Sequence, residues 1–208
     1  MIHFKFYLIT DRLNSTHDPE EWLPRLASGG LEALQVREKD LSPVELDEYC
    51  RMLQASLAMQ NGAPRFFLND RADIAYSLGF AGVHLTESSM CLRHQAPVLK
   101  QSLLWGVSTH SLECAKKAEE EGADFITFGP VYETPSKAKY GPPVGLKELQ
   151  KAARALDIPV FALGGVTPDR VPECLASGAH GVAAISAIWN AKDPLEALES
   201  FKVALGGL

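Results

Sequence analysis

The chain has 208 residues, of which 46% are hydrophobic and 22% are charged. This composition excludes a disordered chain and predicts one domain, spanning 1–208, with a large core. The formal net charge of −6 argues against a nucleic-acid surface, which needs a basic stripe, whereas a small anionic substrate requires only a few local Lys and Arg residues.

The cysteines and the start of the chain bear on the compartment. The four cysteines lie far apart and form no Cys-x-x-Cys pair, which argues against a zinc site or a disulfide framework. The first apolar run is too short for a signal peptide, and no later segment approaches the ~20 apolar residues of a membrane helix. We therefore expect a cytoplasmic protein that does not enter a membrane.

Eight short runs of branched and aromatic residues alternate with helical segments along the chain. Such runs are typical of strands that are buried on both faces of a parallel sheet. The predicted strands are 4–10, 31–36, 65–68, 81–85, 103–107, 125–128, 160–163 and 181–185, and the apolar character of the last one extends to Ile188.

Several helices between these strands have recognisable start signals. Asp18, Ser42 and Asp193 can each cap a helix whose first residue is proline, since proline at that position gives up an amide that has no intrahelical partner. Thr167 and Pro168 repeat this arrangement after the seventh strand. The helix that starts at Ser42 is expected to end near position 60, and further helices are expected to end near positions 78, 122 and 156.

Eight alternating strands and helices predict a single-domain α/β fold, the closed (β/α)8 TIM barrel, with an open doubly wound sheet as the alternative. Active sites in such barrels lie at the C-terminal ends of the strands. Polar groups that follow the predicted strands are therefore candidates for one shared cavity: Thr10, Asp11, Gln35, Arg37, Lys39, Asn69, Asp70, His84, Glu87, Ser108, His110, Thr134, Ser136, Lys137, Gly165 and Ser186.

The ends of the last two strands suggest a phosphate site. Gly164 and Gly165 would let the backbone approach a ligand, and the helix start that follows supplies free amides. Loops after strands seven and eight often form a phosphate site together in these barrels. A tight turn without a ligand is the alternative for the two glycines.

Gln35, Arg37 and Lys39 alternate, so a strand would point all three side chains to one side. Arg37 could bind phosphate oxygens through two hydrogen bonds, and Lys39 would act as a point charge. The alternative is a solvated strand end at which these residues form ion pairs with Glu38 or Asp40. The alternation favours a polyanion site.

Two further segments could complete a site for a phosphorylated ligand. Asn69 and Asp70 offer oxygen ligands that suit Mg²⁺ held jointly with substrate phosphates, although a plain turn would use the same residues. Lys137 lies on a loop that is long enough to close over a ligand. His84 and His110 are each interpreted as structural. Together these features suggest a reaction that joins or eliminates a phosphorylated compound and a diphosphate.

Over nearly its whole length the chain resembles the thiamine phosphate synthase and thiazole tautomerase family. The resemblance rests on Tyr-Leu-Ile-Thr-Asp at 7–11, Gln-Val-Arg-Glu-Lys at 35–39, Leu-Asn-Asp-Arg at 68–71, Gly-Val-His-Leu at 82–85, Gly-Val-Ser-Thr-His-Ser at 106–111, Gly-Pro-Val-Tyr-Glu-Thr-Pro-Ser-Lys at 129–137, and the two last strand ends. These motifs, in this order, are specific for the family.

For a synthase, the resemblance implies that a pyrimidine methyl diphosphate loses pyrophosphate and that a thiazole phosphate captures the resulting carbocation. It implies roles for several positions of this sequence: Arg37, Lys39, Asn69 and Lys137 on the diphosphate; Asp70 on Mg²⁺; Gln35, Ser108, Thr134 and Ser136 around the pyrimidine and diphosphate; and Gly165, Ile185 and Ser186 on the thiazole phosphate. A homo-oligomer is left open.

Two positions bear on the choice between synthase and tautomerase, and they favour different answers. Ser89 stands where synthases carry a second Asp ligand of Mg²⁺, and only Glu87 is close enough in sequence to substitute. The tautomerase also lacks that Asp, but it carries its catalytic His where this chain has Pro130. The synthase is therefore the leading hypothesis, with the tautomerase and a non-catalytic protein that binds thiamine precursors as alternatives.

Overall fold

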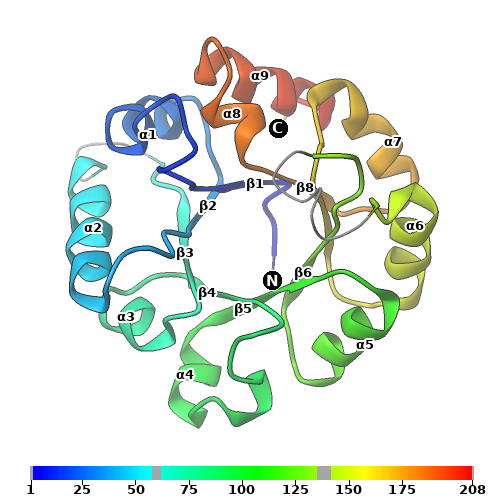
Figure 1. Ribbon diagram of the computed structural model, residues 1–208, viewed down its shortest axis with the longest axis horizontal. Coiled ribbons are helices and arrows are strands. Elements are labelled where there is room, and N and C mark those ends of the chain that lie inside the picture. Colours follow the sequence, from blue (N-terminus) through cyan, green and yellow to red (C-terminus); the bar gives the residue numbers. More distant parts are fainter. Residues whose placement is uncertain (1, 58–61, 135–141, 208) are drawn as a thin grey trace.

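The predicted strands form one closed parallel barrel in the computed structural model, which describes residues 2–57, 62–134 and 142–207 (Figure 1). The strands are β1 (Phe6–Ile9), β2 (Ala33–Val36), β3 (Arg65–Asn69), β4 (Gly82–Leu85), β5 (Leu104–Thr109), β6 (Phe125–Phe128), β7 (Val160–Leu163) and β8 (Gly181–Ala184). Each strand pairs with the next, and β8 closes on β1 with Val182 opposite Phe6. The TIM-barrel prediction is confirmed, and the alternative of an open sheet is wrong.

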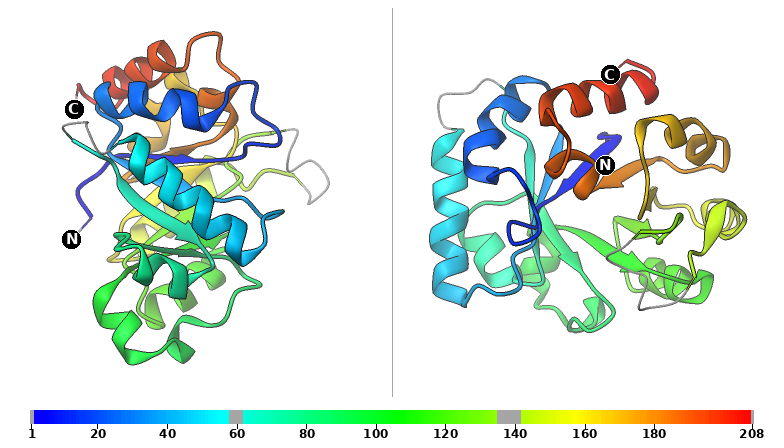
Figure 2. Two further views of the ribbon diagram at one scale, coloured as in Figure 1. Left: turned by 90° about the vertical axis from the view of Figure 1, so that its left-hand side faces the viewer. Right: turned by 45° about the horizontal axis from the view of Figure 1, so that its top comes forward.

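Helices surround this barrel, as Figures 1 and 2 show. They are α1 (Pro19–Ser28), α2 (Pro43–Ser56), α3 (Ala72–Ser77), α4 (Pro97–Ser102), α5 (Leu112–Glu120), α6 (Gly145–Ala155), α7 (Val171–Ala176), α8 (Ser186–Trp189) and α9 (Pro194–Ala204), with the 3₁₀ helices η1 (Leu92–His94) and η3 (Pro168–Arg170). None of the helices within the described ranges has both the length and the apolar character that crossing a bilayer requires.

Three of the predicted helix starts have the expected hydrogen bonds. The Asp18 carboxylate accepts from the Glu20 amide, and the Asp193 carboxylate accepts from two amides of α9. Ser42 and Glu45 form a complete capping box, in which each side chain accepts from the backbone amide of the other residue. These starts were predictable because the capping contacts are local.

The local structure differs from the prediction at three places. The chain between β4 and β5 contains η1 and α4, which were not predicted and which have no side-chain cap. The last strand ends at Ala184, Ile185 precedes α8, and Ala187 and Ile188 belong to that helix, because an apolar run alone does not distinguish a strand from a buried helix. Thr167 precedes η3 as predicted, but its side chain forms no capping hydrogen bond.

The interior of the barrel is filled by aromatic rings at the N-terminal end of the strands. Phe4 precedes β1, and its ring centroid lies 5.1 Å from that of Phe161 and 5.7 Å from those of Phe67 and Phe125. The remaining core packs between the barrel and its helices. Because the rings occupy the N-terminal end, polar side chains that point into the barrel gather toward the opposite end.

Candidate active site

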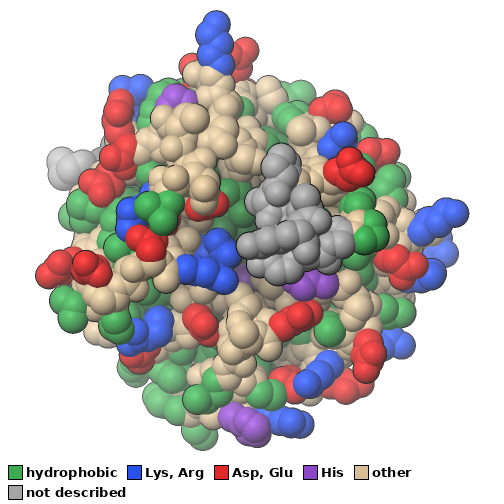
Figure 3. Space-filling view, in the orientation of Figure 1, with side chains coloured by type: hydrophobic (Ala, Val, Ile, Leu, Met, Phe, Trp, Pro, Cys, Tyr) green, Lys and Arg blue, Asp and Glu red, His purple; other side chains and the backbone are tan. Residues whose placement is uncertain are grey.

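Most of the predicted site residues lie at the C-terminal ends of the strands, on the face that Figure 1 turns toward the viewer. Gln35, Asn69 and Ser108 belong to β2, β3 and β5, whereas Arg37, Lys39, Asp70, Thr134, Gly165, Ile185 and Ser186 lie in the segments that follow β2, β3, β6, β7 and β8. Ser136 and Lys137 lie outside the described residues. Figure 3 shows basic side chains near the centre of this face.

Gln35 and Asn69 form a partly buried pair across neighbouring strands. The Gln35 amide nitrogen Nε2 donates to Asn69 Oδ1 over 3.1 Å, and Gln35 is 2% exposed. The Gln35 oxygen Oε1 is buried and has no hydrogen-bond partner. A buried acceptor without a partner is costly, so this atom is available for a donor on a ligand. Asn69 uses its oxygen in this contact, and its amide nitrogen remains able to donate a hydrogen bond to an anion.

The predicted register of Gln35, Arg37 and Lys39 holds only in part. The strand ends at Val36, so the alternation that places side chains on one face does not extend over Arg37 and Lys39. The Arg37 amide donates to Thr10 Oγ1 over 2.9 Å, and Lys39 is exposed in a turn. The β2 end therefore presents Arg37 and Lys39 from a loop that Thr10 anchors to β1.

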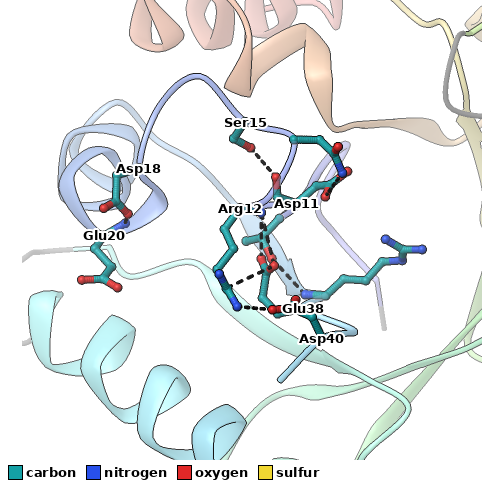
Figure 4. A network of polar contacts seen from close by, with 10 residues as sticks. Asp11, Arg12, Ser15, Asp18, Glu20, Glu38 and Asp40 are labelled. Atoms are coloured by element: carbon teal, nitrogen blue, oxygen red, sulfur yellow. Dashed lines mark hydrogen bonds and ion pairs between the residues drawn. The ribbon is translucent and has the colours of Figure 1, made fainter. Parts of the chain in front are cut away.

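Arg12 contacts the acidic residues of this loop (Figure 4). Its Nε lies 3.8 Å from Glu38 Oε2, and its Nη2 donates to Asp40 Oδ2. The alternative that Arg37 and Lys39 pair with Glu38 or Asp40 is therefore wrong. Burial raises the pKa of Glu38, although hydrogen bonds from Thr10 and the Arg12 amide oppose this effect.

A buried histidine forms hydrogen bonds with side chains of three other strands inside the barrel. His84 of β4 is 1% exposed, and its Nε2 lies 3.1 Å from Ser108 Oγ. The same nitrogen lies 3.4 Å from Thr127 Oγ1, and Nδ1 lies 3.4 Å from the Tyr7 hydroxyl. Burial, assisted by the nearby charge of Arg37, lowers the pKa of His84 to about 3. A neutral ring therefore supports the Ser108 hydroxyl, in agreement with the predicted structural role of His84.

Asp70 is the strongest candidate for a metal ligand. It is exposed immediately after β3 and has a φ of 71°, the left-handed conformation that non-glycine residues seldom adopt. Within the described ranges, no three His, Cys, Asp or Glu side chains are grouped so that they could hold a metal. Mg²⁺ is commonly bound by one or two carboxylates together with substrate phosphates and water, so the donor set fits Mg²⁺ that arrives with a diphosphate.

The segment after β4 differs from the second metal site expected in a synthase. The Ser89 hydroxyl accepts a hydrogen bond from the Thr86 amide over 2.8 Å and forms a second hydrogen bond with the Thr86 hydroxyl. Ser89 therefore stabilises a turn. Glu87 is exposed and has no ion-pair partner within the parts of the chain that the structure describes. It is therefore free to reach a ligand.

The two glycines after β7 are required by the protein's own packing. Gly164 and Gly165 have φ values of 95° and 65°. A Cβ atom on Gly164 would lie 2.5 Å from Pro130 Cβ, and one on Gly165 would lie 2.6 Å from the Glu133 carbonyl oxygen. The glycines thus let the segment after β6 pack closely on the turn. Arg170 donates to the Gly165 carbonyl oxygen over 2.6 Å, which fixes the orientation of this peptide.

The comparison with known proteins agrees with this arrangement. The family model for thiamine monophosphate synthase matches residues 6–188, which include all eight strands. The chain belongs to this family. The resemblance that the motifs indicated is therefore confirmed.

Individual relatives cover most of this family member. A protein of Geobacter sulfurreducens that is provisionally named a thiamine-phosphate synthase is 46% identical over 196 residues, or 94% of this chain and 91% of that protein. A thiamine-phosphate synthase of Chlorobium luteolum is 38% identical over 195 residues, or 93% and 89% of the two chains. The structure of a thiamine phosphate pyrophosphorylase from Pyrococcus furiosus superposes with a TM-score of 0.84 at 32% identity and covers 97% of this chain and 95% of that one.

Sequence reasoning missed Arg12, Tyr7 and Thr127 as parts of this site. Tyr7 and Thr127 lie within apolar strands, so their polar atoms were not distinguishable from core positions. The sequence did contain a hint of the role of Arg12. This residue follows the first strand, and the two acidic residues that alternate with Arg37 and Lys39 after β2 are possible partners for it. Only the pairing of β1 with β2 shows that these segments meet.

Proposed function

We propose that this family member is a thiamine phosphate synthase. It joins 4-amino-2-methyl-5-hydroxymethylpyrimidine diphosphate to hydroxyethylthiazole phosphate and releases pyrophosphate. Its family and its relatives support a transferase of this kind. The observation that carries the proposal is the Gln35–Asn69 pair, which offers a buried acceptor for an amino group and a donor for an anion beside two cations with no ion-pair partner in the described residues.

The diphosphate would be held by Arg37, Lys39, Lys137 and Asn69. Arg37 and Lys39 come from the loop after β2, and Lys137 would come from the segment after β6, outside the described residues. Positive charge placed where the leaving group gains negative charge stabilises the transition state more than the bound substrate. We assign the catalytic role to these three cations.

The pyrimidine and the thiazole would occupy neighbouring positions at the C-terminal end of the barrel. Ser108, supported by His84, would face the pyrimidine diphosphate together with Gln35, Thr134 and Ser136. Backbone amides of Gly165, Ile185 and Ser186 would bind the thiazole phosphate at the ends of β7 and β8. The Arg170 contact supports this role because it turns the Gly165 carbonyl toward the protein.

Asp70 would hold Mg²⁺ jointly with the diphosphate. Glu87, which lies two residues before Ser89 in the sequence, would be the second carboxylate ligand. The ion would neutralise charge on the diphosphate oxygens. The protein's own groups would align the two substrates for the exchange of bonds. The bond between the pyrimidine methylene carbon and the diphosphate oxygen breaks, pyrophosphate leaves with the electron pair, and the thiazole nitrogen donates its lone pair to that carbon.

The deciding experiment is turnover of the purified protein with both substrates, with and without Mg²⁺, following thiamine phosphate. We expect Mg²⁺-dependent product. Lys137→Ala should lower kcat by about a hundredfold or more, since removing one group that stabilises transition-state charge costs ~3–4 kcal/mol. Lys147→Ala, an exposed lysine on α6, is the matched control and should leave the rate unchanged.

The same experiment separates the alternatives. Absence of product from a protein that still binds thiazole phosphate would overturn the synthase assignment and favour the non-catalytic binding protein. Isomerisation of the thiazole carboxylate phosphate without metal would favour the tautomerase. Pro130, which replaces the tautomerase histidine, packs against Gly164 and provides no acid–base group.

A further inference from the structure

The loop after β2 carries alternating charges, and its acidic members share one partner. Arg37, Glu38, Lys39 and Asp40 follow one another, so each cation has a carboxylate next to it in sequence. Neither Arg37 nor Lys39 forms an ion pair with any residue that the structure describes. Both carboxylates instead contact Arg12, which follows β1.

Arg12 binds the two carboxylates through different atoms. Its backbone amide lies 3.3 Å from Glu38 Oε1 and 3.2 Å from Oε2, and its Nη2 donates to Asp40 Oδ2. The Glu38 side chain is only 2% exposed, whereas those of Arg12 and Asp40 are 30% and 37% exposed. Figure 4 shows the Arg12 side chain beside both acidic residues, with its contacts to Glu38 and Asp40 marked.

The consequence is a separation of charge on the loop. Arg37 is anchored through its amide to Thr10 Oγ1, and it lies near enough to His84 for its charge to lower the pKa of that ring. Without Arg12, the carboxylates of Glu38 and Asp40, which adjoin Arg37 and Lys39 in sequence, would lose this cationic partner. They would compete with an anionic ligand, because opposite charges a few ångströms apart attract each other even near a surface.

We propose that Arg12 is a positioning residue that binds Glu38 and Asp40 and thereby keeps Arg37 and Lys39 available for the diphosphate of the substrate. The identity of this ligand rests on the proposed function. The effect itself requires only a polyanion, and it can be measured with inorganic pyrophosphate in the absence of turnover.

The test is a double-mutant cycle on pyrophosphate affinity, measured by titration calorimetry with Mg²⁺ at fixed ionic strength. Arg12→Ala keeps the backbone amide that binds Glu38 and mainly frees the partly exposed Asp40, so it should weaken binding about three- to fivefold. Asp40→Asn in that background should restore the affinity to within about twofold of the original protein, since the competing charge is removed. Arg12→Lys should retain part of the affinity because it keeps the charge.

Two controls isolate this effect from folding and from overall charge. Arg51→Ala removes an arginine that pairs with Asp47 on α2, 2.8 Å away, and should leave pyrophosphate affinity unchanged. Thermal unfolding should show that each variant is folded. In a turnover assay, Arg12→Ala should raise KM for the diphosphate substrate more than it lowers kcat.

Lack of recovery in Arg12→Ala/Asp40→Asn would overturn the proposal, since Arg12 would then contact the anion itself or only support the loop. Absence of pyrophosphate binding by the original protein would overturn it as well. Recovery in a protein that makes no thiamine phosphate would support the role of Arg12 and contradict the synthase assignment, so the two failures are distinguishable.

Discussion

At the scale of single residues, the site depends on which way buried polar groups point. Gln35 uses its amide nitrogen on Asn69, and this one contact leaves an acceptor on Gln35 and a donor on Asn69. Ser108 depends in the same way on His84, whose ring is held between Tyr7 and Thr127. A ligand therefore meets groups whose orientation was set before it arrived, which limits the entropy lost on binding.

His180 provides a pH prediction away from the site. Lys5 Nζ lies 3.3 Å from its Nδ1 and can only donate, so Nδ1 accepts, and Nε2 donates to the Phe4 carbonyl oxygen over 3.2 Å. Burial and then the charge of Lys5 lower the pKa of His180. The folded state thus binds fewer protons than the unfolded state below the ordinary pKa of about 6.5, and stability is lost as the pH falls through that value.

We therefore expect the free energy of unfolding of the original protein, relative to His180→Gln, to be larger at about pH 7.5 than at about pH 5. Chemical denaturation at the two pH values would measure this difference. Lys5→Met should reduce the pH effect without abolishing it, because burial remains the larger cause. A difference that does not change with pH would contradict the assignment.

At the scale of elements, the helices that follow the strand-end loops begin at local caps. The capping box at Ser42 starts α2 immediately after the loop that carries Arg37 and Lys39. Ser42→Ala removes the acceptor for the Glu45 amide and should lower the free energy of unfolding by about 1 kcal/mol. Urea denaturation would measure the loss.

Ser200 offers a matched control for this change. It lies inside α9, where its hydroxyl donates to the Glu196 carbonyl oxygen. Alanine is favoured over serine in a helix interior, so Ser200→Ala should be neutral or slightly stabilising. Equal losses for Ser42→Ala and Ser200→Ala would show that the cap contributes nothing specific.

At the scale of the whole molecule, the barrel is closed at one end by aromatic rings and presents its polar groups at the other. Phe161 is fully buried and packs against Phe4 and Phe125, with centroid distances of 5.1 Å and 5.6 Å. Phe161→Ala should cost ~3–5 kcal/mol, because a large cavity would form where the surrounding strands cannot collapse.

Denaturant unfolding would test this prediction, with Tyr76→Ala as the control. Tyr76 is 48% exposed on α3, and replacing it should change stability by no more than about 0.5 kcal/mol. A loss below ~1 kcal/mol for Phe161→Ala would mean that the barrel interior can repack.

Sequence reasoning succeeded where the cause is local. Strand positions followed from runs of apolar residues, and the caps at Asp18, Ser42 and Asp193 followed from contacts two or three residues away. It failed for α4, whose start has no cap, and for the end of β8, where apolar residues continue into α8. In those segments, packing against neighbouring elements decides the conformation. A short window of sequence does not show which elements will be the neighbours.

For the site, the sequence alone determined which residue types follow each strand, and the parallel barrel then brought Gln35, Asn69 and Ser108 to one end. Only the tertiary structure decided their partners. It assigned Glu38 and Asp40 to Arg12, and Ser108 to His84, through contacts between residues 24 to 28 positions apart. The physical reason is that side-chain pairing depends on strand register and depth in the barrel, which arise only after distant segments have packed together.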